Sequence, residues 1–306
     1  MKALLLHNPT AGTGDHDHAD LIQAVQRAGY APEPCSTKDD CFPQILAGDH
    51  DLIVVAGGDG TVGKVLTKLE RRDAPVVIVP LGTANNVARS LGLTIGIPAI
   101  PTPDTLADHL VKLDMGVASY GEDTEVLSEG IGMGALAATM DERVGKGEKG
   151  WDKVLEAREV VARVIAMAAP FKATLRIDGR VIEGDFLFAE ALLHAFVGPA
   201  LQLSPIADSS DGEIDLVLLE PDRRDEMAAW VRSPANSDPP VRIERGRRVE
   251  MEWSTRPALR ADDAKLDLPS SVKRLCLRVQ KDPVRVVVPA PGTSGKRTTT
   301  PAAEVA

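Results

Sequence analysis

Residues 52–61 read LIVVAGGDGT, and this stretch decides the fold of the chain. Its first five residues are all apolar, which is typical of a strand buried on both faces in a parallel sheet. The glycines that follow let the backbone come close to a ligand. Residues 61–69 then have helix-forming sequence, so the amide groups of the turn and of the helix N-terminus can face a phosphate. The stretch therefore predicts a nucleotide-binding turn.

Two common phosphate-binding motifs come close to this pattern, and each fails at one position. The glycine spacing from Gly58 fits the dinucleotide fingerprint G-x-G-x-x-G, but the next strand, residues 75–79, is followed by no carboxylate that could hold a ribose. Gly63 and Lys64 imitate a Walker loop, but Val65 stands where that loop needs a magnesium-binding Ser or Thr. The sequence therefore indicates a nucleotide site of another kind.

Two further loops follow strands in the same way. Residues 80–89 read PLGTANNVAR after the strand at 75–79, and residues 7–12 read HNPTAG after the strand at 3–6. Loops at the carboxyl ends of parallel strands converge on one crevice of the sheet. We therefore expect these two loops and the glycine turn to form one site.

The three loops together resemble those of the diacylglycerol kinase catalytic-domain family, which includes bacterial lipid kinases and sphingosine and ceramide kinases. The family pattern is Asn-Pro-x-Ser/Ala-Gly, Gly-Gly-Asp-Gly-Thr and Gly-Thr-x-Asn-Asp. The chain matches it in that order, except that Asn86 takes the place of the final Asp. The resemblance implies ATP as the phosphate donor and Mg²⁺ as the metal. The cofactor-binding residues that it implies are Asn8, Gly57, Gly58, Asp59, Gly60, Thr61, Gly82, Thr83 and Asn85.

The second half of the chain resembles the family more loosely. Residues 203–215 match its Pro-x-Ala-x-x-x-Asp-Gly-x-x-Asp segment, and Asp211 and Asp215 within them are the predicted metal ligands. The family later carries Asp-Gly-Glu, whose Asp is taken as the general base. The matching residues 262–264 read DDA, so Asp262 is the predicted base, and an alanine stands where the family has its Glu.

The order of the patterns predicts two domains. Strand and helix patterns alternate up to residue 118, which predicts an α/β nucleotide-binding domain with a doubly wound parallel sheet. Residues 119–289 hold mostly strand patterns, which predict a β-rich, sandwich-like domain. The resemblance implies that this domain binds the acceptor lipid. Residues 129–134, EGIGMG, look like the glycine segment that opens the second domain of the family. The tail, residues 290–306, is rich in Gly, Ser, Thr and Pro and is predicted to be disordered.

Composition excludes several classes of function. A net charge of −10 and an aromatic content of 3% argue against a nucleic-acid partner. No apolar run approaches the roughly 20 residues of a membrane-spanning helix. The first strand stops at Asn8–Pro9 and is too short for a signal peptide. The three cysteines, Cys35, Cys41 and Cys276, are an odd number without metal-ligand spacing, so we expect reduced thiols and a cytoplasmic protein.

The function that the resemblance implies is that of an ATP- and Mg²⁺-dependent lipid kinase, with the fold of the NAD kinase/diacylglycerol kinase-like proteins. It would transfer the γ-phosphoryl group of ATP to a hydroxyl of a lipid such as diacylglycerol. Transient contact with a membrane surface and a homodimer are left open. One alternative is an NAD kinase-like phosphotransferase, although residues 8–12 and 82–85 favour the lipid branch. The other alternative is a catalytically weak ATP-binding regulator, suggested by Ala264 and Asn86.

Overall fold

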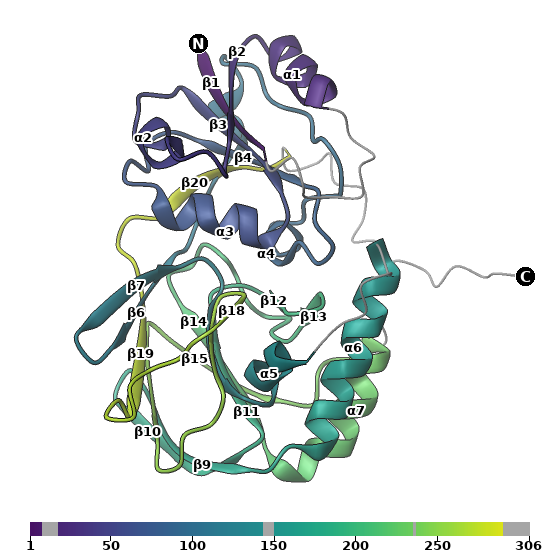
Figure 1. Cartoon of the computed structure of the whole chain (residues 1–306), viewed down its shortest axis with the longest axis vertical. Helices are drawn as coiled ribbons and strands as arrows, with labels where there is room; N and C mark the ends of the chain where they lie inside the picture. Colours follow the sequence, from purple (N-terminus) through teal and green to yellow (C-terminus); the bar gives the residue numbers. More distant parts are fainter. Residues whose placement is uncertain (8–17, 143–149, 235–236, 290–306) are drawn as a thin grey trace, which may run out of the picture.

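The computed structural model describes residues 1–7, 18–142, 150–234 and 237–289. Asn8 and the tail at 290–306 lie outside these residues. Figure 1 shows two lobes: α1 to α4 and the first strands form one, and α5 to α7 with most later strands form the other. The candidate site loops lie where the lobes meet.

The first lobe is built on a six-stranded sheet with the order β2-β1-β3-β4-β20-β5. Strands β1 to β4 pair in parallel, β20 is parallel to β4, and β5 is antiparallel to β20. The bounds of the strands are β1 Lys2–His7, β2 Ala31–Ser36, β3 Leu52–Gly57, β4 Val76–Pro80, β5 Leu110–Leu113 and β20 Val284–Val287. The helices are α1 His18–Arg27, α2 Phe42–Leu46, α3 Asp59–Lys68, α4 Asn86–Ser90 and the 3-10 helix η1 Leu106–His109.

Each face of this sheet has its own apolar core, because successive side chains of a strand point to opposite faces. On β3, Ile53 and Val55 pack into one cluster together with residues of α2 and α3. Leu52 and Val54 pack into the other cluster, together with residues of α1. Helices therefore cover both faces, and the predicted doubly wound parallel sheet is confirmed.

The second lobe contains two six-stranded sheets, with the orders β10-β9-β16-β19-β6-β7 and β15-β14-β11-β8-β17-β18, and a small pair, β12-β13. The bounds are β6 Gly116–Tyr120, β7 Asp123–Leu127, β8 Gly130–Gly134, β9 Phe171–Ile177, β10 Arg180–Phe186, β11 Phe188–Leu192, β12 Phe196–Val197, β13 Leu201–Gln202, β14 Ile214–Leu219, β15 Arg242–Gly246, β16 Arg248–Trp253, β17 Leu259–Ala261, β18 Ala264–Lys265 and β19 Arg274–Val279. The helices are α5 Ala135–Ala138, η2 Thr139–Asp141, α6 Gly150–Met167, η3 Pro221–Arg223 and α7 Arg224–Arg232.

The two large sheets share one apolar core, to which Leu175 and Leu277 contribute from one sheet and Ile131 and Leu216 from the other. The outer face of the second sheet is covered by α5, α6 and α7, which form a further cluster with strand residues such as Phe188. The strand pairs of both sheets are antiparallel. The predicted β-rich C-terminal part is therefore confirmed.

The chain passes between the lobes twice, after β5 and again before β20. The two crossing segments are tied together, because the Gln280 amide donates a hydrogen bond to the Met115 carbonyl at 2.7 Å. Strand β20 comes from the end of the predicted second segment and completes the first sheet. The division of the chain at residue 118 stays a prediction.

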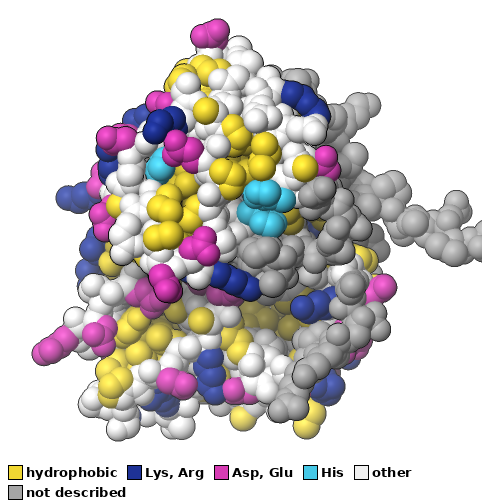
Figure 2. Space-filling model, turned by 45° about the horizontal axis from the view of Figure 1, so that its top comes forward, with side chains coloured by type: hydrophobic (Ala, Val, Ile, Leu, Met, Phe, Trp, Pro, Cys, Tyr) yellow, Lys and Arg dark blue, Asp and Glu magenta, His cyan; other side chains and the backbone are white. Residues whose placement is uncertain are grey.

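Two further features of the molecule are the charge on its surface and the apolar character of its helices. On the face seen in Figure 2, acidic and basic side chains of the described residues are interspersed rather than gathered by sign. None of the helices among the described residues has the length and apolar character that crossing a membrane requires.

Candidate active site at the junction of the lobes

Two glycine loops of the first lobe touch each other through their main chains. One links β3 to α3, and the other links β4 to α4. The Leu81 amide donates to the Gly57 carbonyl at 3.0 Å, and a Cβ added to Gly82 would lie 2.3 Å from the Gly58 Cα. Because no side chain fits between them, both loops need glycine at this contact.

Asp59 joins the two loops through its carboxylate. It is the first residue of α3, and its Oδ1 accepts a hydrogen bond from the Asn86 amide at 2.5 Å. Burial raises the pKa of Asp59, whereas hydrogen bonds from the amides that start α4 lower it. The side chain therefore caps α4 and holds the second loop against the first.

Asn85 has a similar structural role within the second loop. Its backbone is in the left-handed region, with φ of 52°. Its Oδ1 accepts from the Gly82 amide at 2.9 Å, and its Nδ2 donates to the Gly82 carbonyl at 2.7 Å. Both polar atoms of this buried side chain thus close the loop, and Thr83 stays half-buried at the cavity wall.

A cavity of about 400 Å³ lies between these loops and the second lobe. Its size falls in the range of small-molecule sites. Its polar residues are Asp59, Thr83, Asn86, Thr139, Glu129, Arg260, Asp262 and Asp263. Its apolar wall consists of Leu136, Met140, Val161, Val197 and Pro199. The cavity therefore joins the glycine loops to a carboxyl-rich end and to an apolar surface.

Asp262, the predicted base, lies in the hairpin turn between β17 and β18 with φ of 47°. Its Oδ2 accepts from the Ser128 amide and hydroxyl, both at 2.9 Å. Its Oδ1 accepts from the Glu129 amide at 2.8 Å and the Gly130 amide at 3.1 Å. A carboxylate has about four lone-pair sites, so these four bonds leave none for a substrate proton. The geometry argues for a positioning role for Asp262 rather than the role of base.

Two other carboxyls face the glycine loops. The Asp263 Oδ2 would lie 2.9 Å from a Cβ added to Gly60, so it reaches the start of α3. Glu129 is 5% exposed and borders both the 400 Å³ cavity and a neighbouring one of about 190 Å³. No role for Glu129 follows from the sequence, because residues 129–134 match the family only as a glycine segment in which Glu replaces the commoner Asn.

Glu129 and Asp263 hold their protons more tightly than free carboxyls do. Burial raises the pKa of Glu129 well above its ordinary value, and the negative charge of Asp59 adds to the rise. Partial loss of water raises the pKa of Asp263, and its neighbour Asp262 raises it further. The positive charge of Arg260 lowers the pKa of Glu129, but Arg260 also forms a buried ion pair with Glu190, with an Nε–Oε2 distance of 2.9 Å.

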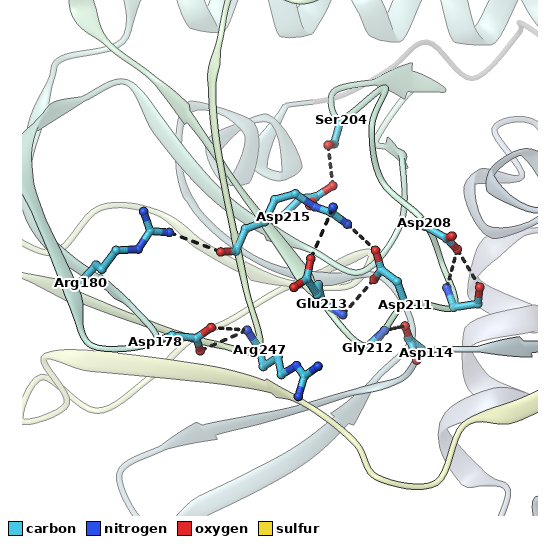
Figure 3. Close-up of polar contacts among 12 residues, drawn as sticks. Asp114, Asp178, Arg180, Ser204, Asp208, Asp211, Gly212, Glu213, Asp215 and Arg247 are labelled. Carbon is cyan, nitrogen blue, oxygen red and sulfur yellow. Dashed lines mark hydrogen bonds and ion pairs between the residues drawn. The ribbon is translucent and has the colours of Figure 1, made fainter.

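The predicted metal ligands Asp211 and Asp215 lie at a different place and already have a cationic partner. Arg245 contacts Asp211 and forms ion pairs with Asp215 at 2.9 Å and Glu213 at 3.4 Å. The other oxygen of Asp215 accepts from the Ser204 hydroxyl at 2.6 Å, as Figure 3 shows. No cluster suited to hold a metal ion through three or more His, Cys, Asp or Glu side chains occurs among the described residues. The structure thus favours a guanidinium, rather than a metal, at Asp211 and Asp215.

The loop that contains Asp211 is also anchored to the junction of the lobes. The Asp114 carboxylate accepts from the Gly212 amide at 2.7 Å, and the Asp114 amide donates to the Ser209 carbonyl at 2.7 Å. Asp114 directly follows β5 and is buried. The segment that sequence analysis linked to a metal therefore fastens the second lobe to the first.

Comparison with known proteins agrees with this architecture. Residues 2–118 match the sequence model of the diacylglycerol kinase catalytic domain. The diacylglycerol kinase of Bacillus subtilis is 24% identical over 250 residues, which cover 76% of this chain and 77% of that protein. The diacylglycerol kinase of Staphylococcus haemolyticus is 26% identical over 240 residues, which cover 71% of this chain and 67% of that protein.

Solved structures show the same fold. The crystal structure of a putative diacylglycerol kinase from Bacillus anthracis aligns with a TM-score of 0.71 at 20% identity, covering 94% of this chain and 97% of the other. An NAD kinase from Archaeoglobus fulgidus in complex with ATP aligns with a TM-score of 0.51 at 13% identity, covering 94% of each chain. The resemblance is thus confirmed. Residues 2–118 are similar to the diacylglycerol kinase catalytic domain, and the chain has the NAD kinase/diacylglycerol kinase-like fold.

The contact between the glycine loops can be tested with Gly82→Ala. The added methyl group meets the Gly58 main chain, which directly follows β3. We expect the free energy of unfolding to fall by about 1–3 kcal/mol, as measured by chemical denaturation. Thr83→Ala, one residue along the same loop, is the control and should change stability little. Equal stability of Gly82→Ala and wild type would contradict the contact.

The cation at Asp211 and Asp215 can be tested with Arg245→Ala. This change leaves the buried Asp215 carboxylate without its counter-charge, which should cost roughly 3–5 kcal/mol of stability. Millimolar Mg²⁺ should restore part of the lost Tm in the variant and leave the wild-type Tm unchanged without nucleotide. Arg247→Ala, an exposed neighbour, is the control. A wild-type Tm that rises with Mg²⁺, and no longer does so in Asp215→Asn, would instead restore the metal site.

Proposed function

We propose that this protein is an ATP- and Mg²⁺-dependent lipid kinase, which transfers the γ-phosphoryl group to a hydroxyl of a lipid such as diacylglycerol. Family membership supports a phosphotransferase. The observation that carries the proposal is the 400 Å³ cavity, because it brings the two glycine loops, a set of carboxyls and an apolar wall together. A nucleotide, a proton acceptor and an acyl chain can each find a matching surface there.

The glycine loops bind the phosphates of the nucleotide in this proposal. Phosphoryl transfer depends mainly on positioning and on neutralising the charge of the phosphoryl oxygens. The amides of Gly58 and Gly60 at the start of α3, and the Thr83 hydroxyl, are the donors that we assign to the phosphates. Asp59 and Asn85 contribute by holding the loops in place rather than by touching the nucleotide. The solved NAD kinase complex with ATP supports ATP use at the level of the fold.

The donor set at the carboxyl-rich end suits Mg²⁺ bound together with a nucleotide. Asp59, Glu129, Asp262 and Asp263 border the cavity with Arg260, and that guanidinium is already paired with Glu190. Mg²⁺ in kinases takes most of its ligands from phosphates and water, with one or two carboxylates. Asp263, which is exposed, is the carboxylate that we assign to it. When bound, the ion would neutralise charge on the transferred group.

For the general base we propose Glu129. A base needs a free lone pair directed at the acceptor hydroxyl and a pKa near the working pH. Glu129 borders the cavity, and its raised pKa makes it a stronger proton acceptor than an ordinary carboxylate. Asp262 would position it, because the Asp262 Oδ1 holds the Glu129 amide at 2.8 Å.

The walls of the cavity favour a lipid acceptor with an uncharged or cationic head. Leu136, Met140 and Val161 offer apolar surface to an acyl chain. An anionic head would meet the negative charges of Asp59 and Asp263 at the reacting end, and such repulsion is strong where water is excluded. We therefore favour a neutral hydroxyl lipid of the diacylglycerol kind.

The proposal predicts ADP release that depends on both lipid and Mg²⁺. Purified protein with ATP should turn over with dispersed diacylglycerol and stop when the metal is chelated, as followed by a coupled ADP assay. A sphingoid base, phosphatidylglycerol and NAD are the comparison acceptors. Turnover with NAD alone would replace the proposal with an NAD kinase. ATP binding without turnover on any acceptor would favour the regulator that Ala264 and Asn86 suggested.

Glu129→Gln tests the base by activity and by stability. Loss of the proton acceptor should lower kcat by about 10²–10⁴-fold, while calorimetry shows ATP binding unchanged. Asp263→Asn is the matched control for a charge loss in the same cluster, and it should alter the Mg²⁺ dependence rather than abolish the base. Full activity of Glu129→Gln would show that Glu129 is not the general base.

The stability of the same variant has a defined pH dependence. Because the folded-state pKa of Glu129 is raised, the folded protein binds its proton more tightly than the unfolded chain. Wild-type stability should therefore fall as pH rises from the ordinary Glu pKa through the folded-state value. The stability of Glu129→Gln should not fall in this way, so the variant should be more stable than wild type at neutral pH. The expected difference is about 1.4 kcal/mol for each pH unit by which folding raises the pKa of Glu129. Denaturation at pH 4.5 and at pH 7.5 measures the difference.

A further inference from the structure

An exposed tryptophan, Trp151 at the start of α6 in the second lobe, is contacted by two arginines, one of them from α4 of the first lobe. The guanidinium carbon of Arg89 lies 5.4 Å from the ring centroid of Trp151, and that of Arg158 lies 5.1 Å from it. Trp151 is 48% exposed, whereas Arg158 is 7% exposed. A nearly buried cation thus shares one aromatic ring with a second cation from the other lobe.

Main-chain carbonyls hold both guanidinium groups in place. Arg89 Nε donates to the Ala84 carbonyl at 2.6 Å. Arg158 Nε donates to the Pro199 carbonyl at 3.1 Å, and its Nη2 donates to the Ala200 carbonyl at 2.8 Å. Within the described ranges, no carboxylate forms an ion pair with either arginine. Each guanidinium has five N–H donors, so several donors on both remain for a ligand.

The two positive charges disfavour one another in this arrangement. Burial lowers the pKa of Arg158, and the charge of Arg89 lowers it further. Burial also lowers the pKa of Arg89, although the carboxylate of Asp59 acts in the opposite direction. An anion between the two groups would relieve this repulsion.

We propose that Arg89, Trp151 and Arg158 form a binding site for a phosphate group that bridges the two lobes. Guanidinium groups bind phosphate through paired hydrogen bonds, and their orientation here is fixed in advance by the carbonyls. Ala84 belongs to the second glycine loop, and Pro199 belongs to the wall of the 400 Å³ cavity. A phosphate at this site would therefore couple the nucleotide loop to the second lobe. A soluble nucleotide or a phospholipid head could supply it.

Trp151 offers a direct readout that requires no turnover. The other two tryptophans, Trp230 and Trp253, are 6% and 3% exposed, so Trp151 should dominate any ligand-induced change in fluorescence. Titration with inorganic pyrophosphate at constant ionic strength should change this signal, and chloride should not. Trp151→Phe should remove the signal, while calorimetry still detects pyrophosphate.

The arginines decide whether the proposal stands. Arg89→Gln and Arg158→Gln should each weaken pyrophosphate binding by about tenfold or more. Arg163→Gln is the matched control, because Arg163 lies on the same helix, is exposed and pairs with Glu142 at 2.9 Å. Arg89→Gln leaves the Arg158 contacts intact, so the test survives if Arg158→Gln fails to fold. Circular dichroism establishes which variants are folded.

Two further experiments distinguish a nucleotide from a phospholipid head as the source of the phosphate. In one, ATP replaces pyrophosphate. In the other, the protein is sedimented with phosphatidylcholine vesicles that contain or lack phosphatidylglycerol. Arginine-dependent binding of ATP supports the site with a nucleotide ligand, and arginine-dependent sedimentation supports it with a lipid head. If folded arginine variants bind pyrophosphate, ATP and vesicles as wild type does, the proposal fails, whatever the kinase assay shows.

Discussion

The arrangement of the site depends on the main-chain contact between Gly58 and Gly82. It allows two loops from neighbouring parallel strands to act as one surface, and Asp59 then locks that surface by capping α4. The capping carboxylate is half-buried, so its amide partners offset much of the cost of removing it from water. This explains why the loop needs an acidic side chain even where that side chain does not touch a ligand. The orientation of α4, and with it the position of Arg89, follows from this lock.

The second lobe adds charge to this surface at a cost in stability. Glu129 and Asp263 approach the start of α3 although Asp59 is already there. Burial raises the pKa of both carboxyls, and a neighbouring negative charge raises each further, that of Asp59 for Glu129 and that of Asp262 for Asp263. Asp262 holds the loop before β8 to the hairpin after β17 and so keeps the carboxyls together. Carboxyls that are held close together and have raised pKa values are typical of functional sites. A bound cation would offset their negative charge. The cluster is therefore better explained by ligand binding than by the needs of the fold.

Much of this could be predicted from the sequence, because the signals are local. Residues 52–61 and 75–89 each contain an apolar strand and the glycine loop that follows it. The roles of individual carboxylates could not be predicted in the same way. Asp262 is saturated by donors about 130 positions away in the chain, beginning with Ser128. Asp215 finds Arg245 only because β14 and β15 are neighbours in the sheet. Such pairings depend on strand order, which periodicity does not reveal.

The structure gives a physical reason for Asn86, the residue at which the chain departs from the family pattern. Asn86 Nδ2 donates to the Gly198 carbonyl at 3.1 Å, which orients the amide across the junction of the lobes. An aspartate there would place an acceptor against that carbonyl and add another negative charge beside Asp59. The Oδ1 of Asn86 is buried, borders the cavity and has no hydrogen-bond partner among the described residues. A buried acceptor without a partner is costly, and a hydroxyl donor in the cavity would satisfy it. The neutral amide is therefore compatible with an alcohol acceptor, and the substitution alone gives no reason to regard the site as inactive.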